Sequence, residues 1–354
     1  MTTTTLQQIQ KDLGATFDRD TQSIPVSFGN DAEALAAARN QVAICDRSHW
    51  GLLRLSGEEQ LRFLHNQSTN DFNNLQPGQS QDTVFTNSTA RTIDLATAYA
   101  TEDAILLLVS PNRRETMMKW LDRYIFPFDK VELEDISDTH SIFSLIGPQS
   151  DTVWEKLGVS VDLPANSHQM VDLQQMQVRV ATGNGLAMPG YTLIVNREEA
   201  ATVWQLLTET AGVPPMGDAC WEKLRILQGR PAAEAELTED YNPLEAALWH
   251  NISFEKGCYI GQETIARLNT YKGVKTQLWG VRLPSFVEPG TPVMLDGKQV
   301  GTLTSCTETP EGVFGLAYIR TKAGGLGLQV SIGKVEADVV DLNFASRGYL
   351  AAQT

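Results

Sequence analysis

The chain has 354 residues, of which 42% are hydrophobic and 20% are charged, and its formal net charge is −15. This length exceeds the size at which one hydrophobic core usually stops growing, so two or three domains are expected. The negative charge disfavours broad binding to nucleic acid or to an anionic membrane, because neutralising phosphates requires clustered Lys and Arg, although a local basic pocket for a small anion stays open. No uninterrupted apolar stretch approaches the roughly 20 residues needed to span a bilayer.

The amino terminus opens with Met1 and four threonines, followed by Leu6, Ile9 and Leu13 at helical spacing. It lacks a basic start and an apolar core, so we expect no secretory signal. The cysteines include no CxxC pair and no Cys/His pair at zinc spacing, which indicates a reducing compartment and no metal site. We therefore expect a cytoplasmic protein, or a protein of the chloroplast stroma if this is a trimmed plastid chain. The four cysteines are Cys45, Cys220, Cys258 and Cys306.

Helical and strand patterns mix along the first two thirds of the chain. They do not alternate as regular βαβ units, which predicts an α+β arrangement of layers. The predicted helices cover residues 31–40, 58–64, 110–124, 150–157, 198–211, 220–228 and 262–268. The predicted strands cover residues 42–45, 52–55, 83–86, 93–100, 105–109, 142–146, 178–181 and 191–195.

From Val274 onward the pattern changes to short β runs with alternating polarity. Asp296-Gly297 separates two of these runs, 293–295 and 299–303, and is a strong hairpin signal. This tail predicts a separate small β-barrel, joined to the rest by a polar linker over residues 269–275.

The most informative segment is Lys256–Glu263, with the sequence KGCYIGQE. It places Cys258 between two glycines, near an ammonium and just before a predicted helix. A nearby cation or a helix N-terminus lowers the pKa of a thiol and favours the reactive thiolate. The alternative interpretation of this motif is a buried structural cysteine at a strand-to-helix turn, since most free cysteines behave as small core hydrophobes.

The usual catalytic signatures are missing. Gly183–Gly185 lacks the third glycine of a dinucleotide-binding loop, and the chain has no P-loop lysine and no nucleophile elbow. Arg225, on a helix near the chain centre, could clamp a carboxylate or simply be ion-paired on the surface. Asp94 follows Arg91 at the entrance of a strand. Its carboxylate could contact a ligand, but an Asp at such a position also commonly caps a turn. Structural roles are expected for the five isolated histidines, His49, His65, His140, His168 and His250.

The segment Lys256–Glu263 matches the K-G-C-[FY]-x-G-Q-E signature of the YgfZ family, folate-binding relatives of the glycine-cleavage T-protein (aminomethyltransferase). The residues Ala90–Leu95 are most similar to the branch found in chloroplasts and their bacterial relatives. Further blocks that resemble the family are Asp46–Gly51, Phe63–Asp71, Leu75–Gly78, Leu145–Gln149 and Asn242–Ala246.

The resemblance implies an α+β fold, a three-domain cloverleaf around a central channel with a small C-terminal β-barrel. It also implies that tetrahydrofolate or a derivative binds in the channel. The expected domains are 1–140, 141–270 with the KGCYIGQE motif, and the barrel at 271–354. The first two domains of this fold are interleaved, so these boundaries are approximate.

The resemblance also implies roles for particular residues. Leu95 stands where the T-protein has its catalytic Asp, and Thr192 stands where the T-protein has a Glu that contacts the pterin. Whether the protein is an enzyme therefore stays open, because Leu95 cannot take a proton. The implied folate-binding residues are Arg225, Asn66, Asn70, Asp94, Tyr191 and Thr192. The implied catalytic residues are Cys258 and Lys256, supported by the motif residues Gly257, Tyr259, Gly261, Gln262 and Glu263.

Three functional hypotheses follow. The first is a tetrahydrofolate-binding accessory factor for iron–sulfur cluster assembly or repair, in which Cys258 is a redox or mixed-disulfide residue. Its partners would be iron–sulfur assembly proteins or iron–sulfur client enzymes. The second is a folate-dependent aminomethyl transferase. The third is a folate-binding scaffold in which Cys258 is structural.

Overall fold

The computed structural model describes residues 5–18 and 24–353, so Met1 and the first threonines lie outside the described residues. The chain divides into two compact units, each assembled from three segments that alternate along the sequence. The division into three domains near residues 140 and 270 stays a prediction. Unit 1 comprises Met1–Gln60, Leu75–Gln81 and Thr97–Glu222, and unit 2 comprises Leu61–Asn74, Asp82–Ala96 and Lys223–Thr354.

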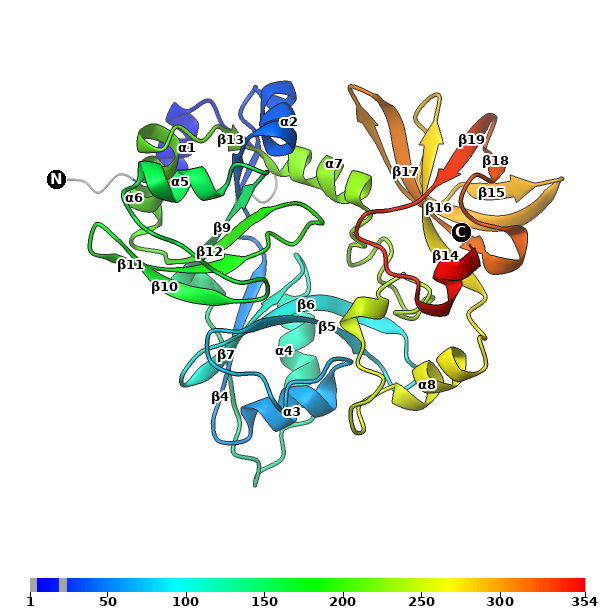
Figure 1. Ribbon diagram of the computed structural model, residues 1–354, viewed down its shortest axis with the longest axis horizontal. Coiled ribbons are helices and arrows are strands. Elements are labelled where there is room, and N and C mark those ends of the chain that lie inside the picture. The colour runs from blue at the N-terminus through cyan, green and yellow to red at the C-terminus, as the bar shows by residue number, and fades with distance from the viewer. Residues whose placement is uncertain (1–4, 19–23, 354) are drawn as a thin grey trace. The chain divides into compact units, whose positions relative to one another are not determined.

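A six-stranded sheet with the order β10-β11-β12-β9-β3-β13 forms the core of unit 1 (Figure 1). Side chains alternate across a strand, so Phe143 and Leu145 of β9 and Leu193 of β12 share one face. They pack there against residues of α1, α5 and α6 in one buried cluster. Thr192 therefore lies on the opposite face, paired in register with Ser144. The elements are α1 (Leu6–Asp12), β3 (Ala43–Asp46), β9 (His140–Ile146), α5 (Asp151–Lys156), β10 (His168–Leu173), β11 (Met176–Thr182), β12 (Gly190–Asn196), α6 (Ala200–Gln205), a π-helix η2 (Leu206–Thr210) and β13 (Pro215–Met216).

The pair His168 and Arg179 links β10 to β11 and gives unit 1 a pH-dependent stability. Nη1 of Arg179 donates to Nδ1 of His168 at 2.9 Å. Burial, and then the charge of Arg179, lower the pKa of His168 to about 4. Between pH 6.5 and 4 the unfolded chain therefore binds more protons at this histidine than the folded chain, so stability falls as the pH falls through that window.

We expect the free energy of unfolding to fall between pH 7 and pH 5 in both wild type and His168→Gln. The fall should be larger in wild type by about 1–2 kcal/mol, after allowance for solvent screening. Glutamine keeps an acceptor for Arg179 but does not titrate. Urea unfolding of both proteins at the two pH values measures the difference. An equal fall in the free energy of unfolding of the two proteins would contradict a low pKa at His168.

A second sheet has the order β5-β6-β7-β4-β8. The helix predicted from residue 110 begins only at Arg114, because Asn112 adopts a left-handed φ of +63° that a helix does not tolerate. The remaining elements up to residue 228 are β1 (Thr16–Phe17), β2 (Pro25–Ser27), α2 (Asp31–Asn40), β4 (Gly51–Ser56), α3 (Gln60–Gln67), β5 (Ser80–Thr86), β6 (Thr92–Ala100), β7 (Ala104–Val109), α4 (Arg114–Asp122), β8 (Glu132–Asp135), η1 (Ser137–Thr139) and α7 (Asp218–Gln228).

The predicted C-terminal barrel is confirmed as a closed barrel of strands β14-β17-β16-β15-β18-β19 within unit 2 (Figure 1). Asp296 and Gly297 both have positive φ, +48° and +75°, as the predicted two-residue hairpin between β15 and β16 requires. Part of the predicted linker is helical instead, since α8 runs to Thr270. The elements are η3 (Trp249–Asn251), α8 (Gln262–Thr270), β14 (Thr276–Leu283), β15 (Pro292–Leu295), β16 (Lys298–Thr309), β17 (Gly312–Arg320), η4 (Thr321–Ala323), β18 (Gln329–Ile332), β19 (Val335–Val340) and η5 (Gly348–Gln353).

The segment before α8 is anchored to the core of unit 2. Ile265 of α8 is fully buried and clusters with Trp249 and Tyr259. In the described part of the chain, no helix combines the length and the apolar composition needed to cross a membrane.

Candidate functional site

Cys258 lies on an exposed loop of unit 2 directly before α8, and its thiol is exposed. Gly257 beside it is also exposed, whereas Lys256 and Tyr259 on either side are buried. None of the four cysteines, all within the described residues, forms a disulfide. The loop therefore presents one thiol to solvent between two buried anchors.

Lys256 fixes this loop to the last turn of α3 and the residues just after it. Its Nζ donates to the carbonyl oxygens of His65 at 2.5 Å, Ser68 at 2.8 Å and Asn70 at 2.6 Å. Burial lowers the pKa of Lys256 to about 8. An ammonium has three N–H donors, and these bonds use all of them, so Lys256 acts here as a tether.

Asn66 and Asn70, two of the implied folate-binding residues, lie on the tethered segment. The backbone carbonyl of Asn66 accepts from the N–H of Ile260 at 3.3 Å, and its side chain is exposed. Nδ2 of Asn70 donates to the carbonyl of Asp82 at 2.9 Å. The structure thus brings Asn66 next to the cysteine loop and gives Asn70 an internal bond.

Gly261 forms the N-terminal boundary of α8 and has a left-handed φ of +86°. A Cβ there would lie 2.6 Å from Oγ1 of Thr86 and 2.9 Å from the carbonyl oxygen of Asn87. Thr86 already donates to the carbonyl of Ile260 at 2.7 Å. Only glycine fits this close approach. Gln262 and Glu263 then begin the helix, and Glu263 lies in the first turn as predicted.

Gly261→Ala is expected to reduce the free energy of unfolding by about 2–3 kcal/mol, from the left-handed backbone and the close contact together. Gly257→Ala is the matched control, because a Cβ there meets only Nε2 of His65 at an ordinary 3.8 Å. We expect that variant to stay within about 0.5 kcal/mol of wild type. Chemical denaturation compares the two, and similar losses in both would contradict the role of Gly261.

His65 and Asp71 also lie beside the cysteine loop, a proximity that no motif in the sequence predicted. Nδ1 of His65 lies 3.0 Å from Oδ1 of Asp71. Burial and then Lys256 lower the pKa of His65, and Asp71 opposes both. The other ring nitrogen of His65, Nε2, lies 3.5 Å from Nδ2 of Asn73. The six-residue spacing of the pair is the only signal that sequence reading could have used.

Arg225 is almost fully buried, and its guanidinium has partners inside the chain. Nη1 donates to Oε2 of Glu236 at 2.8 Å, and Nη2 donates to Oγ of Ser305 at 2.9 Å. Glu236 is fully buried and also accepts from Oγ1 of Thr304 at 2.6 Å. The carboxylate that Arg225 clamps is thus Glu236, a residue that the sequence did not single out.

Asp94 and Leu95 lie on β6 and are both buried. Leu95 packs in an apolar cluster with Ile226 and Leu237. Arg91, just before this strand, donates from Nη1 to the carbonyl of Asp240 at 2.7 Å. A carboxylate at position 95 would lie among apolar side chains, so the leucine is consistent with its surroundings.

Tyr191 and Thr192 belong to unit 1, and both have internal hydrogen bonds. The hydroxyl of Tyr191 donates to Oδ1 of Asp151 at 2.5 Å, and burial followed by this carboxylate raises the pKa of Tyr191 to about 12. Oγ1 of Thr192 donates to the carbonyl of Gly183 at 2.9 Å. Tyr191 thus links β12 to α5, and Thr192 links β12 to the loop that follows β11.

These observations define what the site can do. In the described residues, no group of three or more His, Cys, Asp or Glu side chains is arranged to hold a metal ion. The exposed Cys258 is a thiol that a partner can reach, on a loop that Lys256 and Gly261 hold in place. Thiol–disulfide exchange and covalent adduct formation are chemistries open to such a thiol.

Comparisons with known proteins agree with this architecture. Residues 6–256 match the family model of the GCVT N-terminal domain. A relative from Arabidopsis thaliana, named "Putative transferase At1g60990, chloroplastic", is 45% identical over 318 residues, which is 89% of this chain and 73% of the relative. An aminomethyltransferase from Caldanaerobacter subterraneus is 28% identical over 92% of this chain and 91% of its own length.

A solved structure shows the same fold. The glycine cleavage system aminomethyltransferase T from Bartonella henselae superposes with a TM-score of 0.85, covering 96% of this chain and 97% of that one at 20% identity. This likeness confirms the predicted α+β, T-protein-like fold with its C-terminal barrel. The family model covers more than half of the sequence. The chain therefore belongs to the GCVT-domain family.

Proposed function

We propose that this protein is a tetrahydrofolate-binding accessory factor of the YgfZ type that supports iron–sulfur cluster assembly or repair. The observation that carries the proposal is the exposed Cys258 on a loop anchored by Lys256 and Gly261. The resemblance places the acid that would serve aminomethyl transfer at position 95, where this chain has the buried Leu95. The chemistry is therefore assigned to the thiol.

Cys258 is proposed to act by thiol–disulfide exchange. Its thiolate attacks one sulfur of a partner disulfide, a mixed disulfide forms, and the other sulfur leaves as a thiolate. The partners are iron–sulfur assembly proteins or iron–sulfur client enzymes. Lys256 supports the reaction by holding the loop, since its donors are all bound to carbonyl oxygens.

Tetrahydrofolate is proposed as the ligand, and the side chains fit it in part. Asp94 offers a carboxylate that suits the amino and N–H groups of a pterin, and Asn66 offers an exposed amide. Arg225, Tyr191 and Thr192 hold internal hydrogen bonds, so contacts from them to folate would require exchange of those bonds. No reaction step is assigned to the folate.

Aminomethyl transfer is the second candidate, and the names of the relatives favour it. Several proteins that are 26–29% identical over more than 90% of this chain are named aminomethyltransferases. Against it stands Leu95, which can neither take a proton nor stabilise a developing charge. A folate-binding scaffold without chemistry is the remaining alternative.

The reducing environment expected for such a thiol agrees with a cytoplasmic or stromal location, and the Arabidopsis relative is named as chloroplastic. The test of function combines two measurements on the purified chain. Titration calorimetry with tetrahydrofolate should show binding, and an assay with aminomethyl-lipoyl carrier protein should yield no methylene-tetrahydrofolate. Turnover in that assay would establish the transferase instead. Absence of folate binding would exclude the folate part of the proposal.

A further inference from the structure

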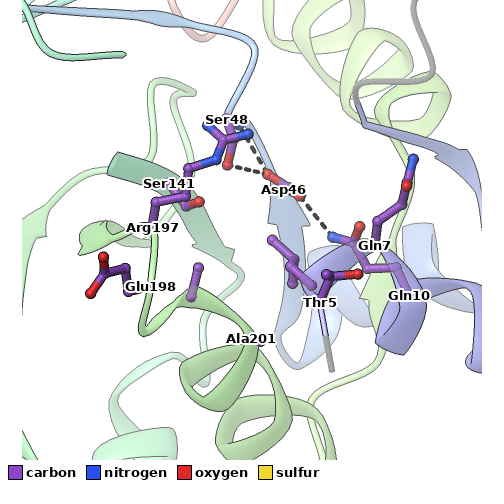
Figure 2. Close-up of a pocket in the computed structure, with 11 residues that line it drawn as sticks. Thr5, Gln7, Gln10, Asp46, Ser48, Ser141, Arg197, Glu198 and Ala201 are labelled. Carbon is purple, nitrogen blue, oxygen red and sulfur yellow. Dashed lines mark hydrogen bonds between the residues drawn. The ribbon is translucent and has the colours of Figure 1, made fainter. Parts of the chain in front are cut away.

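Unit 1 contains a cavity of about 440 Å³ that none of the proposed functional residues lines (Figure 2). Its walls come from α1, the end of β3, β9 and the turn between β12 and α6. The volume lies at the small end of the range for ligand pockets, roughly 300–1,000 Å³. Most of the side chains that line it are polar or charged, which suits a small polar ligand.

Asp46 provides a buried carboxylate in this cavity and is 4% exposed. Oδ1 accepts from the backbone N–H of Ser48 at 2.9 Å and from its hydroxyl at 2.6 Å. Oδ2 accepts from Nε2 of Gln10 at 2.7 Å. A carboxylate oxygen accepts two hydrogen bonds, so Oδ2 keeps one position for a ligand donor. Burial raises the pKa of Asp46, and a cationic ligand group would stabilise its charged form.

Arg197 provides the opposite charge. Figure 2 shows its side chain reaching from the end of β12 toward Ser48 and Asp46. Arg197 is exposed, and its positive charge lowers the pKa of Asp46, although burial raises that pKa more. A guanidinium binds a carboxylate through two parallel N–H bonds. The cavity thus offers an acceptor for an ammonium beside a donor for a carboxylate.

The charge balance narrows the choice of ligand. Asp46 and Glu198 are acidic and Arg197 is the one basic residue among those that line the cavity, so the lining has an excess negative charge. A simple anion is therefore disfavoured. Leu6 and Ala201 add an apolar wall that suits an aliphatic chain.

We propose that this cavity binds a free α-amino acid with a basic side chain. The ammonium binds Asp46, the carboxylate binds Arg197, and the cationic side chain balances Glu198. The proposal is independent of the function assigned to Cys258, because all these residues belong to unit 1 and Cys258 belongs to unit 2.

The test uses L-lysine as the probe, with two analogues that each lack one of its charged groups. Cadaverine lacks the carboxylate, and 6-aminohexanoate lacks the α-ammonium. By calorimetry on the full chain, we expect L-lysine to bind with a micromolar to millimolar Kd and each analogue to bind at least about tenfold more weakly. No binding of L-lysine or L-arginine up to about 20 mM would overturn the proposal, as would equal affinity for cadaverine.

Variants locate the site. Arg197→Gln should weaken L-lysine binding by about tenfold or more, whereas Arg123→Gln, an exposed arginine of the same unit outside the cavity, should leave it unchanged. Asp46→Asn should weaken it similarly. Since Arg197 is exposed, its variant keeps the test decisive even where Asp46→Asn fails to fold. Unchanged binding in Arg197→Gln would place any bound amino acid elsewhere and overturn the assignment.

Discussion

Cys258→Ser is expected to abolish rescue of iron–sulfur enzyme activity in cells that lack this protein, while the purified variant folds and unfolds like wild type. The side chain is exposed, so the change from sulfur to oxygen removes little packing. A serine hydroxyl does not ionise near neutral pH and does not form disulfides, so the exchange chemistry is lost. The measurement is the activity of an iron–sulfur enzyme in deletion cells complemented with wild type or variant.

The matched control is Cys306→Ser in the barrel. Cys306 is half-buried, and burial, as the largest cause, raises the pKa of its thiol, which disfavours the reactive thiolate. We expect the Cys306 variant to rescue fully. Full rescue by Cys258→Ser would remove the redox hypothesis and leave the scaffold. Loss of tetrahydrofolate binding in Cys258→Ser would show that the thiol serves the ligand site.

The cysteine loop shows what sequence reasoning could reach. The motif predicted a helix start after Gly261 and an acidic residue in its first turn, and both are present. The alternative of a buried structural cysteine is wrong, because Cys258 is exposed. Whether Lys256 would face the thiol or the core could not be predicted, since its carbonyl partners lie almost two hundred residues away.

The barrel and the sheets were predictable for a different reason. Alternating polarity and the Asp296-Gly297 turn are local signals, and local backbone preferences decide a two-residue hairpin. Strands with mixed polarity gave no such signal: β10 (His168–Leu173) was missed because Gln169 and Asp172 interrupt its apolar pattern. Its register with β11 is fixed by pairing, which single-segment patterns do not contain.

Arg225 shows where the sequence was least informative. Its pattern allowed either a ligand clamp or a surface ion pair, and the structure gives it a third setting, a buried pair with Glu236. The partner lies in a stretch, residues 234–240, that contains four acidic residues. Only the fold brings Ser305 of the barrel to the same guanidinium.

Arg225→Ala is therefore expected to reduce the free energy of unfolding by about 3–5 kcal/mol, because it leaves the charge of Glu236 buried without its cation. The side chains of Arg225 and Glu236 are 4% and 0% exposed, so water replaces the lost partner poorly. Arg282→Ala, an exposed arginine of β14, is the control and should change stability by no more than about 0.5 kcal/mol. Chemical denaturation followed by tryptophan fluorescence measures both.

The double variant Arg225→Ala/Glu236→Gln separates loss of the ion pair from loss of packing. Removing both charges abolishes the uncompensated carboxylate, while glutamine keeps an acceptor for Thr304 and Ser305. The double variant should consequently be more stable than Arg225→Ala alone, with a coupling energy of about 1–3 kcal/mol. If the stability losses of the single variants Arg225→Ala and Glu236→Gln simply add in the double variant, the ion pair contributes little and Arg225 is held mainly by packing. The guanidinium of Arg225 could then leave Glu236 with little loss of stability. Binding of a folate carboxylate by Arg225 would require this exchange. A strong coupling instead makes Glu236 the permanent partner of Arg225, and the proposed tetrahydrofolate site would then not include this guanidinium.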